Sequence, residues 1–248
     1  MFSQLTKCLT LLMLLCFSTP PVRAQVAHPA DSLPRSSIQV QRLANSPIIT
    51  PASDPSIGTN INGPSLIRVP RWVKHPLGKY YLYFADHNGK YIRLAYANSL
   101  HGNWKVYKPG TLQLAASYFT DHIASPDVIV DEAHHKIRLY YHGLTKSEHI
   151  QHTRVALSSN GINFVAIENP VGVGSAYWRV FQYEGWWYAL SMPGKLWRSR
   201  DGLTLFEAGV QLFPSNPAQI HNACLLQGST LTILYTRFSD KPERILVS

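Results

Sequence analysis

The feature that most constrains this chain is a pair of short apolar runs that recurs four times in a fixed order. Each repeat has a short strand-like run, a turn, and a second run rich in aromatic residues. The paired runs are residues 65–69 with 80–84, 127–130 with 137–141, 179–181 with 186–190, and 223–226 with 231–235. Turn residues separate successive runs at intervals of roughly eight to twelve positions, and no helical period is present. This pattern predicts an all-β fold built from repeated units.

A second marker accompanies the repeat: a serine, a glycine three residues later, and then an aromatic residue. Its copies begin at Ser99, Ser158 and Ser199, so they are 59 and 41 residues apart. Such steps match the roughly 40 to 60 residues of a propeller blade with its loops. We therefore expect a β-propeller with about four blades in this chain. The fourth unit reaches Ser248 before an outer strand, which predicts a product truncated at the C-terminus or an unusual ring closure.

The N-terminal residues 1–24 have the pattern of an export signal. Lys7 precedes an apolar run over residues 8–17, and a cleavage site ends at Ala24. No later stretch is long and apolar enough for a membrane span. Removing the signal leaves Cys224 as the only cysteine, so no intrachain disulfide is expected. We expect a secreted or periplasmic bacterial protein.

The rest of the chain divides into an arm and a propeller. Residues 25–58 form a Pro-rich arm, and residues 59–248 form the propeller. Its predicted blades cover about 59–110, 119–170, 175–214 and, incompletely, 218–248. The net charge is +9 but is dispersed along the chain. Without a Lys/Arg cluster we expect no nucleic-acid partner, and we expect a monomer.

A short segment of the second repeat resembles a known family. Residues Ala124-Ser125-Pro126-Asp127-Val128, followed by Leu139-Tyr140-Tyr141, resemble the Ala-Pro-Asp-Val strand of glycoside hydrolase family 43 and its five-bladed relatives. Residues 63–67 with 79–83 are similar to that family's first blade. The resemblance covers about residues 60–248 and implies a β-propeller of the five-bladed type that acts on a carbohydrate.

The resemblance also implies three acidic groups at the channel: a base on blade one, a pKa-tuning aspartate on blade two, and an acid on blade three. Asp127 matches the second, where a neighbouring negative charge would raise the pKa of the acid. The chain has Asn62-Gly63-Pro64 at the first position and Tyr177-Trp178-Arg179 at the third. We therefore predict that Asp127 works with Asp86 or Asp121. The alternatives are that Asp127 bonds a neighbouring blade and that the other two are turn or loop residues.

Further side chains near the starts of first strands and the ends of second strands are predicted to contact the carbohydrate, because the first strand of each blade lines the channel. They are Asn62, His87, His122, His142, Trp178, Arg179, His221 and Arg237. Aromatic rings can stack on sugars, and Arg154, Arg179 and Arg237 can hold a carboxylate of an acidic sugar. The histidine spacing matches no zinc signature, so we predict no metal and no cofactor. His221 is similar to a channel histidine that supports a bound water or metal ion in relatives. A calcium ion in the channel is expected only by analogy with these relatives.

Three functions remain open from the sequence. The first is a glycoside hydrolase acting on a plant or algal polysaccharide or oligosaccharide. The second is a non-catalytic carbohydrate-binding propeller. The third is a sialidase-like enzyme, because the Ser-x-x-Gly turns resemble aspartate-box turns, although the aspartate is displaced or missing. Two carboxylates from different blades at one channel mouth favour catalysis, whereas a lone Asp127 among rings and arginines favours binding.

Overall fold

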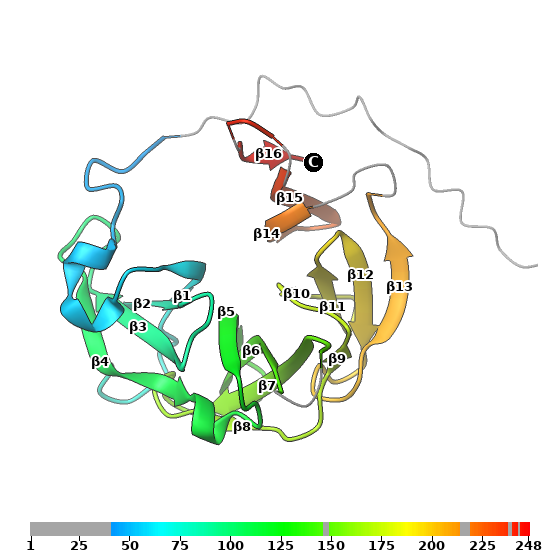
Figure 1. Ribbon diagram of the computed structural model, residues 1–248, viewed down its shortest axis with the longest axis horizontal. Coiled ribbons are helices and arrows are strands. Elements are labelled where there is room, and N and C mark those ends of the chain that lie inside the picture. The colour runs from blue at the N-terminus through cyan, green and yellow to red at the C-terminus, as the bar shows by residue number, and fades with distance from the viewer. Residues whose placement is uncertain (1–40, 146–148, 214–218, 238–239, 243) are drawn as a thin grey trace, which may run out of the picture. The chain divides into compact units, whose positions relative to one another are not determined.

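Four antiparallel sheets hold the strands of the described residues, and the innermost strand of each sheet lies nearest a common axis (Figure 1). The computed structural model describes residues 41–145, 149–213, 219–237, 240–242 and 244–248. The described residues from Arg42 to Ser248 belong to one compact unit. The predicted all-β propeller with about four blades is confirmed. The predicted signal at residues 1–24 lies outside the described residues.

Each sheet is one blade, and its strands follow one another from the axis outward. Blade one contains β1 (Asn62–Arg68), β2 (Tyr80–Ala85), β3 (Tyr91–Ala97) and β4 (Lys105–Gln113). Blade two contains β5 (His122–Asp131), β6 (Lys136–Leu144), β7 (His152–Ser158) and β8 (Val165–Ala166), with β9 (Gly172–Val173) also paired to β7. Blade three contains β10 (Arg179–Tyr183), β11 (Trp186–Ser191), β12 (Lys195–Ser199) and β13 (Glu207–Gln211). Blade four contains β14 (Gln219–Gln227), β15 (Thr230–Arg237) and β16 (Leu246–Val247).

The sequence of β2 is a continuous apolar run because its side chains pack into two different cores, one on each face of the sheet. Tyr81 and Tyr83 belong to the core shared with blade two. Leu82 and Phe84 point to the opposite face, where they pack with Ile57 of the N-terminal arm. Successive side chains of a strand alternate between faces, so a blade covered on both sides needs apolar residues at every position.

The arm covers one face of blade one with two short 3-10 helices, η1 (Pro51–Ser53) and η2 (Pro55–Ile57). Figure 1 shows them in blue beside the first sheet. Asp54 caps η2, because its Oδ1 accepts a hydrogen bond from Ser56 N at 2.9 Å. The described part of the arm therefore packs against blade one.

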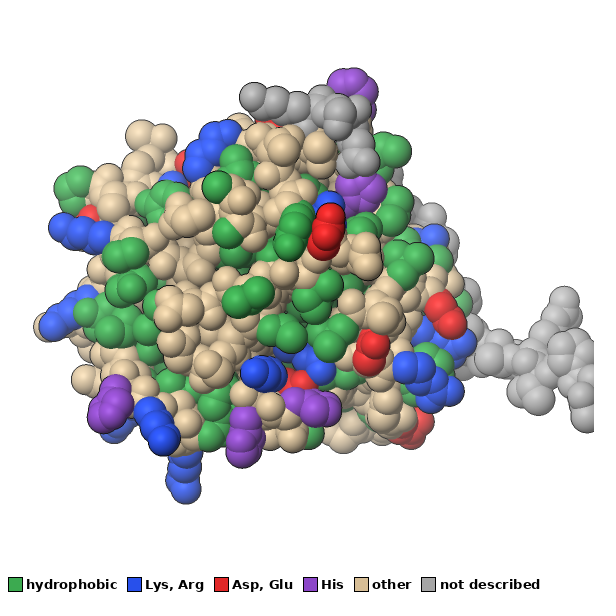
Figure 2. Space-filling model, turned by 90° about the horizontal axis from the view of Figure 1, so that it is seen from below, with side chains coloured by type: hydrophobic (Ala, Val, Ile, Leu, Met, Phe, Trp, Pro, Cys, Tyr) green, Lys and Arg blue, Asp and Glu red, His purple; other side chains and the backbone are tan. Residues whose placement is uncertain are grey.

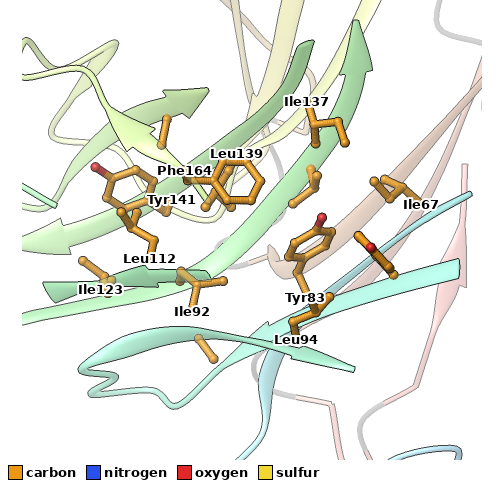
Figure 3. Close-up of a cluster of buried hydrophobic side chains, with 14 of the residues drawn as sticks. Ile67, Tyr83, Ile92, Leu94, Leu112, Ile123, Ile137, Leu139, Tyr141 and Phe164 are labelled. Carbon is orange, nitrogen blue, oxygen red and sulfur yellow. The ribbon is translucent and has the colours of Figure 1, made fainter. Parts of the chain in front are cut away.

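Large side chains fill the wedges between neighbouring blades. Figure 3 shows the wedge between blades one and two. Its labelled residues are Ile67, Tyr83, Ile92, Leu94, Leu112, Ile123, Ile137, Leu139, Tyr141 and Phe164. Trp178 and Trp187 occupy the next wedge, between blades two and three, together with Phe206. The core lies between the sheets and leaves their innermost strands to form the channel.

A side chain at one repeated position links each of the first two blades to the next. Ser65 Oγ in β1 accepts a hydrogen bond from Val128 N in β5 at 2.9 Å. One blade further, Asp127 Oδ2 in β5 accepts a hydrogen bond from Val180 N in β10 at 2.7 Å. The two acceptors are equivalent, since each is the first paired residue after a register shift in its strand.

Tyrosines of the second strands form a second repeated link between blades. Tyr83 OH in β2 donates a hydrogen bond to Gly161 O at 2.7 Å, and Tyr140 OH in β6 donates to Gly202 O at 2.9 Å. Both acceptors lie in the Ser-x-x-Gly turns that the sequence marks. These turns therefore provide the carbonyl that joins neighbouring blades.

The innermost strands of blades one to three each have a left-handed residue near their start, two positions before the residue that faces the next blade. Gly63 has φ of 58°, Ser125 has φ of 46°, and Tyr177, just before β10, has φ of 56°. A Cβ on Gly63 would lie 2.4 Å from Ser125 Cα, so only glycine fits there. Such irregularities redirect the side chains beside them, which places polar groups at one end of the channel.

Among the described residues, no helix is long and apolar enough to cross a bilayer.

Candidate functional site

A chain of polar contacts joins blades one and three at the start of their innermost strands. Asn62 Nδ2 lies 2.6 Å from His87 Nδ1, and Tyr177 OH lies 3.2 Å from His87 Nε2. Because an amide nitrogen can only donate, His87 Nδ1 must accept and its proton is on Nε2. His87 then donates to the Tyr177 hydroxyl. His87 is exposed, so this contact lies at the surface of the molecule.

The contacts continue from Tyr177 into blade two. The Tyr177 and His142 rings lie 4.6 Å apart between centroids, and Tyr177 N donates to His142 Nδ1 at 3.5 Å. The His142 and His122 rings lie edge to face at 6.2 Å. His122 Nδ1 lies 2.7 Å from Asp121 Oδ2. Burial raises the pKa of Tyr177, against a lowering contribution from Asn62, so its hydroxyl keeps its proton near neutral pH. Five residues from three blades are thus linked in one series of contacts that runs through Tyr177. We call Asn62, His87, His122, His142 and Tyr177 the mouth site.

Asp127 lies beside Arg179, two residues after Tyr177 in the chain, and is held by its neighbours. Its carboxylate is buried, with Oδ2 accepting from Val180 N and Oδ1 lying 3.6 Å from Arg179 Nη1. Arg179 Nη1 also donates to Pro126 O at 3.1 Å. Burial raises the pKa of Asp127, and the Arg179 charge and the Val180 hydrogen bond oppose that rise only in part. Asp127 is therefore a buried carboxyl group that holds a proton more firmly than an ordinary aspartate.

The other two predicted carboxylates are half-exposed and have partners of their own. Asp86 Oδ1 accepts from Asn88 N at 2.9 Å, and Asp86 Oδ2 lies 3.6 Å from Arg93 Nη2. Asp121 contacts His122 as described above, and its backbone carbonyl accepts from Lys90 Nζ at 2.6 Å. Asp121 therefore contacts the mouth site through His122, while Asp86 caps the turn that carries His87.

The structure places the remaining predicted residues in different surroundings. Trp178 is 2% exposed, and its Nε1 donates to Ser175 Oγ at 2.6 Å, so its ring packs between blades rather than at the mouth. Arg237 is an exposed residue at the end of β15. His221 lies in β14, but its side chain is outside the described part of the chain. The roles predicted for Arg237 and His221 stay predictions.

The sequence places Tyr177 at the channel, where it departs from the family pattern, but predicts no contact for its side chain. The structure shows that it contacts both His87 and His142. Aligning the repeats by their blade-to-blade positions would have found it, because Tyr177 follows the same spacing as Gly63 and Ser125. A tyrosine where the other blades have glycine and serine indicates a selected contact, since a left-handed φ disfavours large residues.

Within the described residues, no group of three His, Cys, Asp or Glu side chains is arranged to hold a metal ion.

No family model matches the sequence. An uncharacterized protein of Acanthamoeba polyphaga mimivirus is 37% identical over 218 residues, a match that covers 75% of this chain and 61% of that protein. The chain thus spans less than two thirds of that relative's length.

Solved structures of glycoside hydrolases share the fold. A thermostable family-43 glycoside hydrolase has a TM-score of 0.56 at 15% identity, with 76% of this chain and 68% of that chain covered. A family-43 arabinoxylan arabinofuranohydrolase from Bacillus subtilis has a TM-score of 0.55 at 16% identity, with coverage of 75% and 46%. A family-32 β-fructofuranosidase from Bombyx mori has a TM-score of 0.56 at 17% identity, with coverage of 82% and 50%.

These likenesses define the class: the chain has the fold of the β-propeller glycoside hydrolases. The resemblance to the five-bladed propellers that residues 124–128 indicated is confirmed for the fold.

Proposed function

We propose that this chain is a glycan-active propeller that takes its carbohydrate at the mouth site. The observation that carries the proposal is the contact chain from Asn62 through His87 to Tyr177, which reaches across from blade one to blade three. Sugar recognition uses a few converging polar groups together with an aromatic ring. The mouth site offers an amide, three imidazole rings and a phenol ring near the start of the innermost strands.

The hydrolytic form of the proposal is a glycoside hydrolase acting on a plant or algal polysaccharide or oligosaccharide, with Asp127 as the proton donor. Burial raises the pKa of Asp127, and a raised pKa is what a carboxylic acid needs to deliver a proton near neutral pH. Asp121 or Asp86 would act as the second carboxylate. The two carboxyl groups would lie about 5 to 5.5 Å apart in a retaining enzyme and about 6.5 to 9.5 Å apart in an inverting one.

A specific observation also favours a second candidate, a non-catalytic carbohydrate-binding propeller. One oxygen of Asp127 already accepts from Val180 N, and blade one has Asn62 and Ser65 at the positions nearest the channel. Neither residue is a carboxylate. In this form, the mouth site recognises the glycan and Asp127 serves the joint between blades.

Turnover of aryl glycosides by the full chain and by Asp127→Asn separates the two forms. In the hydrolytic form, the wild-type chain releases the aryl group and Asp127→Asn loses turnover by about 10² to 10⁴-fold, as expected when proton transfer is removed. Glu184→Gln is the matched control, because Glu184 is an exposed residue of the turn between β10 and β11. Its turnover should equal that of the wild type.

Each outcome of this comparison decides between the proposals. Full turnover by Asp127→Asn removes Asp127 as proton donor. Glycan binding without turnover in the wild type leaves the binding form. A chain that neither binds nor cleaves any polysaccharide of a broad panel removes the proposed function.

We further propose that the chain is exported and loses residues 1–24. The pattern of Lys7, the apolar run and Ala24 supports this proposal. Mass spectrometry of chain recovered outside the cytoplasm of an expressing bacterium should show Gln25 as the first residue. Chain retained in the cytoplasm with an intact N-terminus would contradict export.

A further inference from the structure

The end of the propeller opposite the mouth site carries a strongly basic loop. β1 and β5 both begin at the mouth, with Asn62 and His122, so the turns that follow these strands lie at the other end of the channel. Residues 68–79 form the end of β1 and its connection to β2. No Asp or Glu occurs between Asp54 and Asp86, whereas five of the twelve residues 68–79 are basic and exposed. They are Arg68, Arg71, Lys74, His75 and Lys79.

Trp72 holds this loop against the turn between β5 and β6 of blade two. Its Nε1 donates a hydrogen bond to Glu132 Oε2 at 2.9 Å, and its ring stacks on His135 with 5.5 Å between centroids. Trp72 and Glu132 are 60 positions apart, which is why the sequence shows no Lys/Arg cluster here. The fold thus brings the exposed Lys136, the residue after His135, close to the basic loop.

A hollow continues this surface toward blade three. Its volume is about 400 Å³, and its lining includes His134 and Lys136 from blade two and Arg200 from the turn after β12. Lys136 and Arg200 are both exposed. In Figure 2, which views the ring from its edge, Lys, Arg and His side chains gather along the lower margin. Positive side chains of two neighbouring blades therefore face one hollow.

The two carboxylates that also line the hollow have partners of their own. Asp131 is buried, and its Oδ2 accepts from Arg138 Nε at 2.9 Å and lies 2.9 Å from His134 Nδ1. Asp201 Oδ1 accepts from two backbone N–H groups of its own turn, at 2.8 Å and 2.9 Å. These contacts leave the lysine and the exposed arginine of the hollow available to a ligand.

Six exposed lysines and arginines of this surface form no ion pair with any described residue. They are Arg68, Arg71, Lys74, Lys79, Lys136 and Arg200, which we call the basic patch. By contrast, Arg93, Arg138 and Arg198 each lie within ion-pair distance of a carboxylate. Like charges held close together repel one another, so a bound polyanion would relieve the repulsion within the patch.

The surroundings of the patch favour one kind of polyanion. Surfaces that bind membranes insert apolar side chains beside their cations, but no large apolar side chain is exposed within residues 68–79 and 131–136. Single-stranded nucleic acid stacks its bases on open aromatic rings, whereas the Trp72 ring is partly buried and stacked on His135. An acidic polysaccharide needs neither feature, because its charged groups repeat along the chain.

We infer that the basic patch binds an acidic polysaccharide, one that bears carboxylate or sulfate groups along its chain. Arg71 and Lys74, on either side of Trp72 in the loop, contact anionic groups of the polymer, and Lys136 and Arg200 hold a further group at the hollow. The inference takes glycan as the ligand class from the proposed function. Because the patch and the mouth site share no residue and lie at opposite ends of the channel, the two can fail separately.

The test is a calorimetric titration of the full chain with polygalacturonate and with its fully methyl-esterified form. Both polymers have the same sugar rings, but the ester carries no charge. We expect the acid polymer to bind the wild type at least about 10-fold more tightly than the ester. Raising the NaCl concentration from about 50 to about 500 mM should weaken this binding at least about 10-fold, because salt screens exposed charges.

Charge reversal locates the binding surface. Arg71→Glu combined with Lys74→Glu should weaken polygalacturonate binding at least about 10-fold, since two attractions become repulsions. Lys136→Glu is an independent variant on blade two and should also weaken it. Arg42→Glu combined with Lys241→Glu is the matched control, because it changes the net charge equally at exposed residues outside the patch, and it should bind like the wild type. Circular dichroism and the melting temperature establish that each variant is folded.

Several results would overturn the inference. They include equal affinity for polygalacturonate and its ester, and equal losses in the patch and control variants. Tighter binding of poly(dT) or of phosphatidylglycerol vesicles would assign the patch to nucleic acid or to a membrane surface instead. Loss of polygalacturonate binding in Tyr177→Ala alone would place the polymer at the mouth, which contradicts the patch and agrees with the proposed function. Binding that depends on Arg71 and Lys74, in a chain whose mouth binds no glycan, would support the patch and remove the mouth site.

Discussion

The Asp127 carboxylate in blade two accepts a hydrogen bond from the backbone N–H of Val180 in blade three at 2.7 Å. Ser65 in blade one has the same relation to Val128 in blade two. The third copy of this position is Arg179, which has no acceptor to offer and instead faces back toward Asp127. Arg179 therefore lacks the side-chain acceptor that Ser65 and Asp127 provide at this position. Asp127 combines a structural joint with the acidity that the hydrolytic proposal requires.

Two variants of Asp127 should distinguish the stability that comes from its hydrogen bond to Val180 N from the stability that comes from its charge. We expect Asp127→Asn to stay close to wild-type stability, because the amide oxygen can still accept from Val180 N. Asp127→Ala should lower the free energy of unfolding by about 2 to 4 kcal/mol, since it removes the acceptor of the buried Val180 N–H and the carboxylate that lies beside Arg179. Urea denaturation measures both values. Equal stability of the alanine and asparagine variants would contradict the joint.

The charge of Asp127 should also appear in the pH dependence of stability. Burial raises its pKa above the unfolded value, so the folded chain binds more protons than the unfolded chain between these two values. Stability therefore falls as pH rises through that window, beginning near 3.8. Relative to Asp127→Asn, the wild type should lose stability as pH increases from this point. A constant difference between the two chains across the window would show that the pKa is not raised.

Two glycines with left-handed φ should respond differently to alanine. A Cβ at Gly63 meets the backbone of Ser125 at 2.4 Å, whereas a Cβ at Gly185 has nothing within 4 Å. Gly185→Ala should cost about 1 to 2 kcal/mol for its conformation alone. Gly63→Ala should cost clearly more, because blades one and two must also move apart. The melting temperatures of the two variants measure this difference. Similar melting temperatures would mean that the close approach of Gly63 to Ser125 does not contribute to stability.

The tyrosine links between blades should contribute measurably to stability. Tyr140→Phe removes the donor to Gly202 O and Tyr83→Phe the donor to Gly161 O. We expect each change to lower the free energy of unfolding by about 1 to 3 kcal/mol, since a buried carbonyl loses its partner. Tyr96→Phe is the control, because Tyr96 packs against the core that contains Tyr83 and its hydroxyl makes no hydrogen bond within the described residues. Variants as stable as this control would indicate that water replaces the lost donor.

The blades followed from the sequence because the strand runs and their turn glycines repeat with the period of the fold. The orientation of individual side chains at the channel could not be predicted from the sequence. Register shifts and left-handed residues there interrupt the alternation of side chains between the two faces of a strand, on which such a prediction depends. Trp178 illustrates this: it adjoins Tyr177 in sequence, yet it packs in the wedge while Tyr177 contacts the mouth site. The pairing of His87 with Tyr177, 90 positions apart, depends on how the blades meet.

The most direct test of the central claim is the affinity of the mouth site for glycan. Xylan and arabinoxylan oligosaccharides should be titrated into the wild type, Tyr177→Phe and Tyr177→Ala at pH 7. The account predicts that at least one oligosaccharide binds the wild type, that Tyr177→Ala binds it at least about 10-fold more weakly because the stacking ring is lost, and that Tyr177→Phe lies between them. Equal affinity of the wild type and folded Tyr177→Ala for the oligosaccharide that binds would contradict it.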